Sequence, residues 1–503
     1  MDKVTLALYG VIGYFVIVMF IGWWASRRVK TLTDFAVAGR RLGPILVFGT
    51  VLATWFGGGT ALGGASMAYS FGLRGVIMDP LGAGVAVILF ALFFAVILRR
   101  LKYITIADFF RAKYGKGMEL ASSIVNIVAY MGWLGALLVS FSAVFQVLLG
   151  IPFEQGIYLG TIVTIIYTFA GGMWSVTLTD FIQMFLLILG IVLIIPFLLG
   201  AVGGWGPIQE AVSLDMYSIL PGPGMEYLGY VGLFGFMYWI SSWVVQGLGS
   251  LSCQDLVQRS LSAKDEKTAK WATFAAGIGY WTIGLIPALV AIWGIALIPE
   301  IDNPDLILPT LAMEVLPTWA FVIFVVGLVA AIMSSSDSAM IIPPTMIAEN
   351  ILPYFKKDVS EKTKVWVARL LVPIIAIVAL LIALYAATIF FLMNLSWELI
   401  LMVQGIPFIL GIYWKKANRL GAYASILVNF AVWIPLIFWT LPYTLEVEGG
   451  VLDWAVWDSI YIAAIPALVA GTITFVVVSL LTQKRDPPKP ILSIDGKPLE
   501  ELK

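Results

Sequence analysis

The chain is a series of long apolar segments separated by short polar ones. About 20 apolar residues in a helix are needed to cross the hydrocarbon core of a bilayer. Strands of a membrane barrel would instead alternate apolar and polar positions over about 10 residues, and these segments are continuous. The pattern therefore predicts an all-α membrane protein with 13 transmembrane helices. Their approximate ranges are 4–25, 43–69, 76–98, 119–150, 155–170, 177–200, 228–250, 268–298, 318–351, 365–386, 388–413, 419–440 and 457–482.

The composition supports this prediction and excludes several functions. Hydrophobic residues make up 61% of the chain and charged residues 12%, whereas soluble domains carry about 25% charged residues. The chain has no histidine and one cysteine, Cys253, which excludes histidine-based metal sites and internal disulfides. It has no GxxxxGK[ST] phosphate loop, and no loop could hold a soluble domain. We therefore expect neither ATP-driven transport within this chain nor an enzyme with catalytic residues.

The distribution of basic residues predicts the orientation. An odd number of spans places the two termini on opposite sides of the membrane. With Arg27 on the cytoplasmic side, 28 of the 30 Lys and Arg residues fall in cytoplasmic segments, and only Lys3 and Arg74 do not. The positive-inside rule then places the N-terminus outside and the C-terminus in the cytoplasm of a cell (plasma) membrane. We interpret residues 1–483 as one multi-pass transporter domain and 484–503 as a short cytoplasmic tail.

Two of the predicted spans contain glycine-rich interruptions. One covers Ala53–Thr60, with three consecutive glycines, and the other covers Trp239–Ser250. Transporter sites form where helices in matching positions of two inverted repeats are broken at mid-membrane. The interruptions lie five spans apart and open two five-span blocks, about 43–200 and 228–440. Close helix packing of the GxxxG kind is the alternative for either interruption alone, but the pairing favours a binding site.

Ionisable residues inside spans add candidate chemistry, because such residues are costly in a membrane and usually functional. Asp180 lies at the start of the sixth span, Asp337 follows three serines in the ninth, and Glu398 lies in the eleventh. A helix cap is the alternative for Asp180, and back-bonding to helix carbonyls is the alternative for the serines. Carboxylate, hydroxyl and carbonyl oxygens favour hard cations such as Na⁺.

Several short motifs, in order along the chain, resemble those of the sodium:solute symporter family. The resemblance implies a LeuT-type 5+5 inverted repeat with one extra N-terminal helix and two extra C-terminal helices. The motifs are Gly39-Arg40-Arg41-Leu42-Gly43, Tyr167-Thr168-Phe169-Ala170-Gly171-Gly172, Gln258-Arg259, Leu308-Pro309-Thr310, the serine block of the ninth span, and Glu349-Asn350.

The resemblance implies positions for the coupling ion. The family's shared Na⁺ site maps onto the backbone carbonyls of Ala53, Phe56 and Ala331 and the hydroxyls of Ser334 and Ser335. A possible second cation site maps onto Asp180, Asp337 and Ser338. Asp337 stands where many relatives have a neutral residue, so it is equally consistent with a carboxyl that binds a proton.

The substrate is less well defined by the sequence. Ala53-Thr54-Trp55 with its following glycines, and Met131-Gly132-Trp133, are similar to the choline-transporter branch, and tryptophan faces attract quaternary ammonium groups. A third aromatic expected from that branch is replaced by Cys253. Amines, amino acids and small carboxylates therefore all stay open. The residues expected to bind substrate are Trp55, Gly58, Thr60, Trp133, Trp239, Trp243, Gln246 and Glu398.

The combined prediction is a sodium-coupled symporter that imports a small organic solute by alternating access. The alternatives are a proton-coupled transporter and a sodium-dependent sensor of the same fold. The expected partners are the solute, Na⁺ and the lipid bilayer, with no nucleic acid and no obligatory protein partner.

Overall fold

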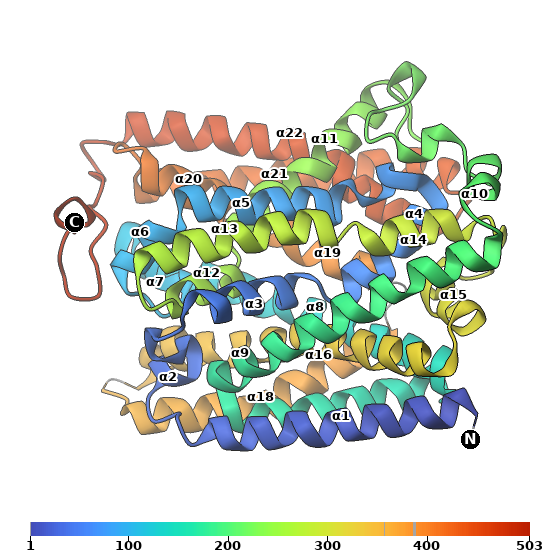
Figure 1. Cartoon of the computed structure of the whole chain (residues 1–503). Helices are drawn as coiled ribbons and strands as arrows, with labels where there is room; N and C mark the ends of the chain where they lie inside the picture. Colours follow the sequence, from blue (N-terminus) through green and yellow to red (C-terminus); the bar gives the residue numbers. More distant parts are fainter. Residues whose placement is uncertain (1, 357, 386–388, 503) are drawn as a thin grey trace.

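The computed structural model describes residues 2–356, 358–385 and 389–502. The side chains of Tyr167, Ala170 and Asn394 are not described. The end of the predicted span 365–386 and the start of the predicted span 388–413 also lie outside the described residues. Within the described residues the regular structure is helical throughout. The helices run along a common direction, and the two termini lie at opposite ends of the bundle (Figure 1).

Ten helical segments of the described chain are long and apolar enough to cross a membrane, and Pro44–Trp55 and Phe153–Ile166 are shorter apolar helices. A multi-pass helical membrane protein is therefore confirmed, whereas the number 13 stays a prediction. The two predicted spans 155–170 and 177–200 correspond to the apolar helices Phe153–Ile166 and Gly172–Val202, which together carry the label α9 (Phe153–Val202). They are separated by a kink at Gly172, whose φ of 52° and ψ of −157° lie outside the helical region and favour glycine.

The first half of the bundle contains α1 (Lys3–Ser26), α3 (Pro44–Trp55), α4 (Gly64–Phe71), α5 (Ala83–Phe93) and the long helices α8 (Lys116–Leu149) and α9. Short helices connect them at one end: α2 (Leu32–Val37), α6 (Ala95–Leu101) and α7 (Ile106–Tyr114). Thr31 with Asp34, and Thr105 with Asp108, form capping boxes that begin α2 and α7. Each box satisfies backbone N–H groups that would otherwise lack partners.

The second half contains the helices α11 to α22. They are α11 (Gly232–Gly249), α12 (Gln254–Ser262), α13 (Glu266–Ile283), α14 (Ile286–Gly294), α15 (Ile307–Val315), α16 (Thr318–Met346), α17 (Leu352–Phe355), α18 (Glu361–Tyr385), α19 (Ile389–Ile400), α20 (Ile406–Tyr413), α21 (Arg419–Val447) and α22 (Leu452–Leu481). The last two pack on each other along their length as a hairpin (Figure 1).

Burial separates central from peripheral helices. About 72% of the apolar windows in Lys116–Leu149 and Thr318–Phe355 is buried inside the protein, against 22% for Lys3–Ser26 and Arg419–Val447. Helices α8 and α16 are therefore central, while α1 and α21 present most of their surface outward. The serine block of the ninth predicted span thus lies at the centre of the bundle.

The first predicted interruption contains a break, whereas the second is helical and the chain breaks only at its end. Helix α3 ends at Trp55, and Phe56 leaves the helical region with ψ of 70°. Helix α11 continues to Gly249, so Trp239–Gly249 is helical, and the chain breaks over Ser250–Cys253 before α12. A Cβ on Gly249 would lie 2.9 Å from the Trp397 carbonyl oxygen, so this glycine serves close helix packing.

The tail is folded against one end of the bundle. The Ile494 N–H donates to the Leu101 carbonyl (3.0 Å), and Asp495 pairs with Lys102 (2.8 Å). The Lys113 ammonium donates to the Lys489 carbonyl at 3.0 Å. Residues 488–502 therefore cover the ends of α6 and α7.

Candidate ion and substrate sites

The end of α3 and the middle of α16 meet at the bundle centre. The Ser334 hydroxyl donates to the carbonyls of Ala53 (2.7 Å) and Ala331 (2.8 Å). The Ser335 hydroxyl donates to the carbonyl of Thr54 at 2.7 Å. These side chains are fully buried. The structure thus brings together four of the five positions expected for Na⁺ and places Phe56, also fully buried, at the adjoining break.

The oxygen atoms at this junction are suited to bind a hard cation. They are uncharged carbonyl and hydroxyl oxygens, which are the ligand types that hard cations prefer. Each serine hydroxyl keeps its lone pairs while its hydrogen is donated to a carbonyl. The first three serines of the block do not all face α3, because Ser336 donates to the Ile332 carbonyl of its own helix at 2.7 Å.

A cluster of buried charges lies next to this junction. Asp180 of α9 accepts a hydrogen bond from Thr50, and its second oxygen finds no donor among the described residues. The guanidinium of Arg259 lies 3.8 Å from Asp180 and donates to Ser338. Ser338 in turn donates to Asp337 at 3.0 Å.

The structure therefore brings Asp180, Asp337 and Ser338 together and adds an arginine that the sequence argument left out of the site. All four side chains are at most 3% exposed. Arg259 lies within ion-pair distance of Asp180 and is connected to Asp337 through the Ser338 hydroxyl. The sequence argument counted Arg259 among the basic residues of a cytoplasmic segment, whereas its side chain is fully buried beside Asp180.

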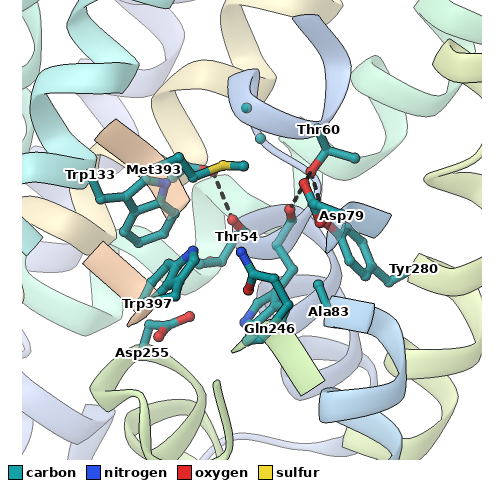
Figure 2. A pocket seen from close by; sticks show the side chains of 14 residues that line it. Thr54, Thr60, Asp79, Ala83, Trp133, Gln246, Asp255, Tyr280, Met393 and Trp397 are labelled. Atoms are coloured by element: carbon teal, nitrogen blue, oxygen red, sulfur yellow. Dashed lines mark hydrogen bonds between the residues drawn. The ribbon is translucent and has the colours of Figure 1, made fainter. Parts of the chain in front are cut away.

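A small cavity of about 30 Å³ lies beside the broken segment that follows α3. Figure 2 shows Trp133 and Met393 on one side of it and Thr60, Asp79 and Tyr280 on the other. The lining residues are Thr54, Trp55, Gly57, Gly59, Thr60, Asp79, Ala83, Trp133, Gln246, Asp255, Tyr280, Ser335, Met393 and Trp397. We call this space the central cavity.

One wall of the central cavity is a carboxylate held by two hydroxyls. Thr60 donates to Asp79 at 2.6 Å, and the Tyr280 hydroxyl also donates to Asp79. Thr60 and Tyr280 lie 2.7 Å apart. Asp79 is 4% exposed and fixed in orientation, so its negative charge faces the cavity without a basic partner among the described residues.

The opposite wall is aromatic. The rings of Trp133 and Trp397 lie 5.2 Å apart, and Tyr130 contacts both rings at 5.7 Å. The Tyr130 hydroxyl donates to Asp255, the second carboxylate of the cavity. Across the cavity the Trp55 ring meets Tyr280 edge-on at 5.9 Å. The Trp55 indole N–H finds no acceptor within the described protein, so it is available to an oxygen atom of a ligand.

Four of the eight predicted substrate residues line the central cavity: Trp55, Thr60, Trp133 and Gln246. Gly58 lies between two lining glycines. Trp239 and Trp243 lie on the same face of α11 as Gln246 but nearer the start of the helix. At the rise of an α-helix, Trp239 is about 10 Å from Gln246 along the helix axis. Trp239 instead donates to the Ile219 carbonyl at 3.0 Å. Glu398 is fully buried and does not line the cavity, although its neighbour Trp397 does.

Other lining residues were missed by the sequence argument. Asp79 carried a usable signal, because it is an acid inside the apolar segment 76–98 and precedes Pro80. Trp397 was the neighbour of the residue chosen, Glu398. Tyr280 and Asp255 carried no local signal, since an isolated tyrosine in an apolar helix and an acid in a predicted loop are ordinary features.

The sequence is similar to that of known transporters. The profile of the sodium:solute symporter family matches residues 35–429. High-affinity choline transporter 1 of Caenorhabditis elegans is 26% identical over 458 residues, which cover 85% of this chain and 77% of that protein. The human high affinity choline transporter 1 is 27% identical, with 83% and 74% covered. The osmoregulated proline transporter OpuE of Bacillus subtilis is 24% identical, with 94% of each chain covered.

The fold is similar to that of solved transporters. A Na⁺-coupled sialic acid symporter in a substrate-bound, outward-open state superposes with a TM-score of 0.75, covering 94% of this chain and 97% of that chain at 21% identity. Mhp1, a nucleobase-cation-symport-1 family transporter, superposes with a TM-score of 0.51 at 16% identity, covering 93% and 98%. At these identities the likeness concerns the fold alone.

Proposed function

Because the chain belongs to the sodium:solute symporter family, we propose that it couples the entry of Na⁺ to the import of a small, positively charged organic solute. The family and the relatives are transporters, so the expectation of a membrane transporter rather than an enzyme is confirmed. Alternating access would move the two repeats, about 43–200 and 228–440, around the central cavity.

The proposed class of substrate follows from the charge of the central cavity. Asp79 and Asp255 line it, and none of its 14 lining residues, all of them described, is Lys or Arg. A negative, largely desolvated cavity favours a positively charged ligand and disfavours an anion. Small carboxylates, which the sequence left open, therefore become the least favoured class.

The aromatic wall narrows the ligand further. A quaternary ammonium over a tryptophan face gains roughly 0.5–2 kcal/mol, and Trp55, Trp133 and Trp397 all line the cavity. The Trp55 N–H, which lacks an acceptor, suits a substrate that also carries a hydroxyl or carboxylate oxygen. Choline combines both groups, and the Caenorhabditis elegans and human relatives are high-affinity choline transporters. A zwitterion such as proline is the second candidate, in line with the proline transporters among the relatives.

The junction of α3 and α16 is the proposed Na⁺ site. Its ligands would be the carbonyls of Ala53, Phe56 and Ala331 and the hydroxyls of Ser334 and Ser335. The Ser334 hydroxyl oxygen already lies within 3 Å of the Ala53 and Ala331 carbonyl oxygens. Na⁺ bound there would tie the broken end of α3 to α16 and thereby fix the glycine segment that forms one wall of the central cavity.

The Asp180–Asp337 cluster favours a second coupling ion. The carboxyl groups of Asp180 and Asp337, connected through Arg259 and Ser338, offer oxygen ligands for Na⁺ or a site for a proton. Proton coupling is therefore the second candidate mechanism.

The membrane potential would drive this transport. Import of one Na⁺ with one cationic solute moves two charges inward, and each charge contributes ~2.3 kcal/mol per 100 mV. Each charge therefore raises the solute accumulation ratio about 50-fold.

The decisive experiment is uptake by the purified protein in liposomes. We expect labelled choline to enter only when Na⁺ is outside, and we expect an inside-negative potassium diffusion potential to accelerate it. Unlabelled tetramethylammonium should compete, whereas acetate should not. Labelled proline measured in parallel distinguishes a zwitterion from a cation.

Other results would overturn separate parts of the proposal. Equal uptake from Na⁺ and K⁺ buffers at one pH would exclude sodium coupling. Uptake driven by an inward proton gradient without Na⁺ would establish the proton-coupled alternative. Sodium-dependent ligand binding without uptake or counterflow would indicate a sensor.

A further inference from the structure

We propose that a basic hollow at the end of α1 binds the headgroup of an anionic phospholipid. The hollow is bounded by the end of α1, the α2–α3 link and α9. Its lining residues are Arg27, Arg28, Lys30, Asp34, Arg41 and Trp174, and we call it the basic hollow. It lies far from the central cavity, at the end of the bundle where the C-terminus lies (Figure 1), so the inference does not depend on the proposed substrate.

The charge of the basic hollow is not balanced by the protein. Its one acid, Asp34, already pairs with Arg41 at 2.6 Å and accepts from the Thr31 N–H and hydroxyl as the cap of α2. Across the described part of the chain, no carboxylate lies within ion-pair distance of Arg27, Arg28 or Lys30. Three positive charges therefore face the hollow, and an anion is the ligand that would compensate them.

Aromatic rings hold two of these guanidinium groups in place. Arg27 lies 4.0 Å from the centre of the Trp23 ring, and Arg28 lies 4.3 Å from Trp24 and 5.1 Å from Trp174. Trp174 is 8% exposed, and its indole N–H has no acceptor among the described residues. A buried donor without a partner is costly, and a phosphate oxygen would satisfy it.

The surroundings of the hollow favour a lipid over a soluble anion. Phe20, Trp23 and Trp24 on the last turns of α1 are 63%, 54% and 44% exposed. Exposed tryptophans beside arginines mark the level of the headgroups in a membrane protein, and basic pockets at that level bind anionic headgroups. The phosphate would occupy the hollow while the acyl chains lie along the apolar surface of α1.

A lipid at this position would contact several elements at once. Arg41 lies three residues before the start of α3 at Pro44, and Leu42 is bonded through its backbone to Ser262 and Lys264 at the end of α12. The headgroup would therefore link peripheral α1 and α9 to the base of α3, the helix whose other end forms the proposed Na⁺ site.

The test compares phosphatidylglycerol binding by the wild type and by Arg27→Gln/Arg28→Gln/Lys30→Gln. Binding is measured by thermal unfolding in nanodiscs of phosphatidylcholine with increasing phosphatidylglycerol, and by native mass spectrometry of retained lipid. Each basic residue near a membrane surface changes affinity for anionic lipid by about fivefold, so we expect the triple variant to lose about 100-fold. The variant Lys356→Gln/Lys362→Gln/Lys484→Gln removes the same charge outside the hollow and should stay within about twofold of wild type.

A second variant provides an independent test in case the triple variant does not fold. Trp174→Phe keeps the ring and removes only the N–H, and it should weaken phosphatidylglycerol binding several-fold. Equal binding by wild type, the triple variant and Trp174→Phe would overturn the proposal. Equal protection by glycerol 3-phosphate, which has no acyl chains, would also overturn it, because the site would then be one for soluble phosphate.

Discussion

At the residue scale, neighbouring serines of α16 have different partners. Ser334 and Ser335 reach across to the carbonyls of Ala53 and Thr54, whereas Ser336 bonds within its own helix. The helical turn causes this difference, because residues one apart point about 100° away from each other. A run of serines in a sequence therefore does not by itself identify which hydroxyls bind an ion.

The first prediction follows from that difference. Ser334→Ala or Ser335→Ala removes one proposed Na⁺ ligand and should raise the Na⁺ concentration for half-maximal uptake roughly tenfold. Ser336→Ala removes a hydroxyl of the same helix that does not face α3, and its Na⁺ dependence should match wild type. Identical Na⁺ dependence in all three variants, with normal expression, would refute the site.

A second prediction concerns two buried acids with different surroundings. Asp79→Asn removes a charge that lines the central cavity and should lower the affinity for a cationic solute about tenfold or more. Glu398→Gln removes an equally buried acid whose two oxygens find no donor among the described residues and which does not line the cavity. Its solute affinity should stay close to wild type, and isothermal titration in Na⁺ buffer measures both. A larger loss in Glu398→Gln than in Asp79→Asn would restore the sequence-based assignment of Glu398.

At the element scale, the break in α3 depends on close approach to α16. A Cβ on Gly57 would lie 2.0 Å from the Ser335 hydroxyl oxygen and 2.9 Å from its Cβ. The absence of a side chain at this position therefore lets the broken segment reach the serines. In the predicted second break the helix continues to Gly249, where a Cβ would lie 2.9 Å from the Trp397 carbonyl oxygen, so this glycine allows close packing of α11 on α19.

The third prediction tests this contact. Gly57→Ala should destabilise the protein by about 1–3 kcal/mol through overpacking and should weaken Na⁺ binding at the same time. Gly64→Ala lies in the same segment, but its Cβ would meet only the Asp79 carbonyl at 3.8 Å, an ordinary contact. Thermal unfolding with and without Na⁺ should therefore separate the two variants. Equal melting temperatures would show that the junction is loosely packed.

At the scale of the whole molecule, the basic residues lie almost entirely on one side of the predicted topology. Of 30 Lys and Arg residues, 28 fall in segments predicted to be cytoplasmic. The termini lie at opposite ends of the bundle (Figure 1), as an odd number of crossings requires. The direction of insertion is still a prediction from the positive-inside rule.

The single cysteine makes this orientation straightforward to test. Leu214 and Phe355 are 88% and 85% exposed and lie in segments predicted to be outside and cytoplasmic. In intact cells, a membrane-impermeant maleimide should label Leu214→Cys at once but Phe355→Cys only after permeabilisation. The wild type should stay unlabelled, because Cys253 is fully buried. The reverse labelling pattern would invert the topology.

The sequence alone determined the features that depend on local composition. The length of the apolar segments predicted a helical membrane protein, and the order of the motifs predicted the family. The glycine and serine blocks located the residues that meet at the junction of α3 with α16. These properties depend on residues close together in the chain, or on one residue type repeated along it.

Only the tertiary structure decided which distant side chains share a site. It placed Arg259 beside Asp180, Tyr280 against Asp79, and Trp397 rather than Glu398 on the cavity wall. It also moved the second break to Ser250–Cys253 and left Trp239 and Trp243 outside the cavity lining. The physical reason is that the sequence of a membrane span is mostly apolar regardless of the direction in which its few polar side chains point. Their direction is fixed by the packing of other helices, which no single segment encodes.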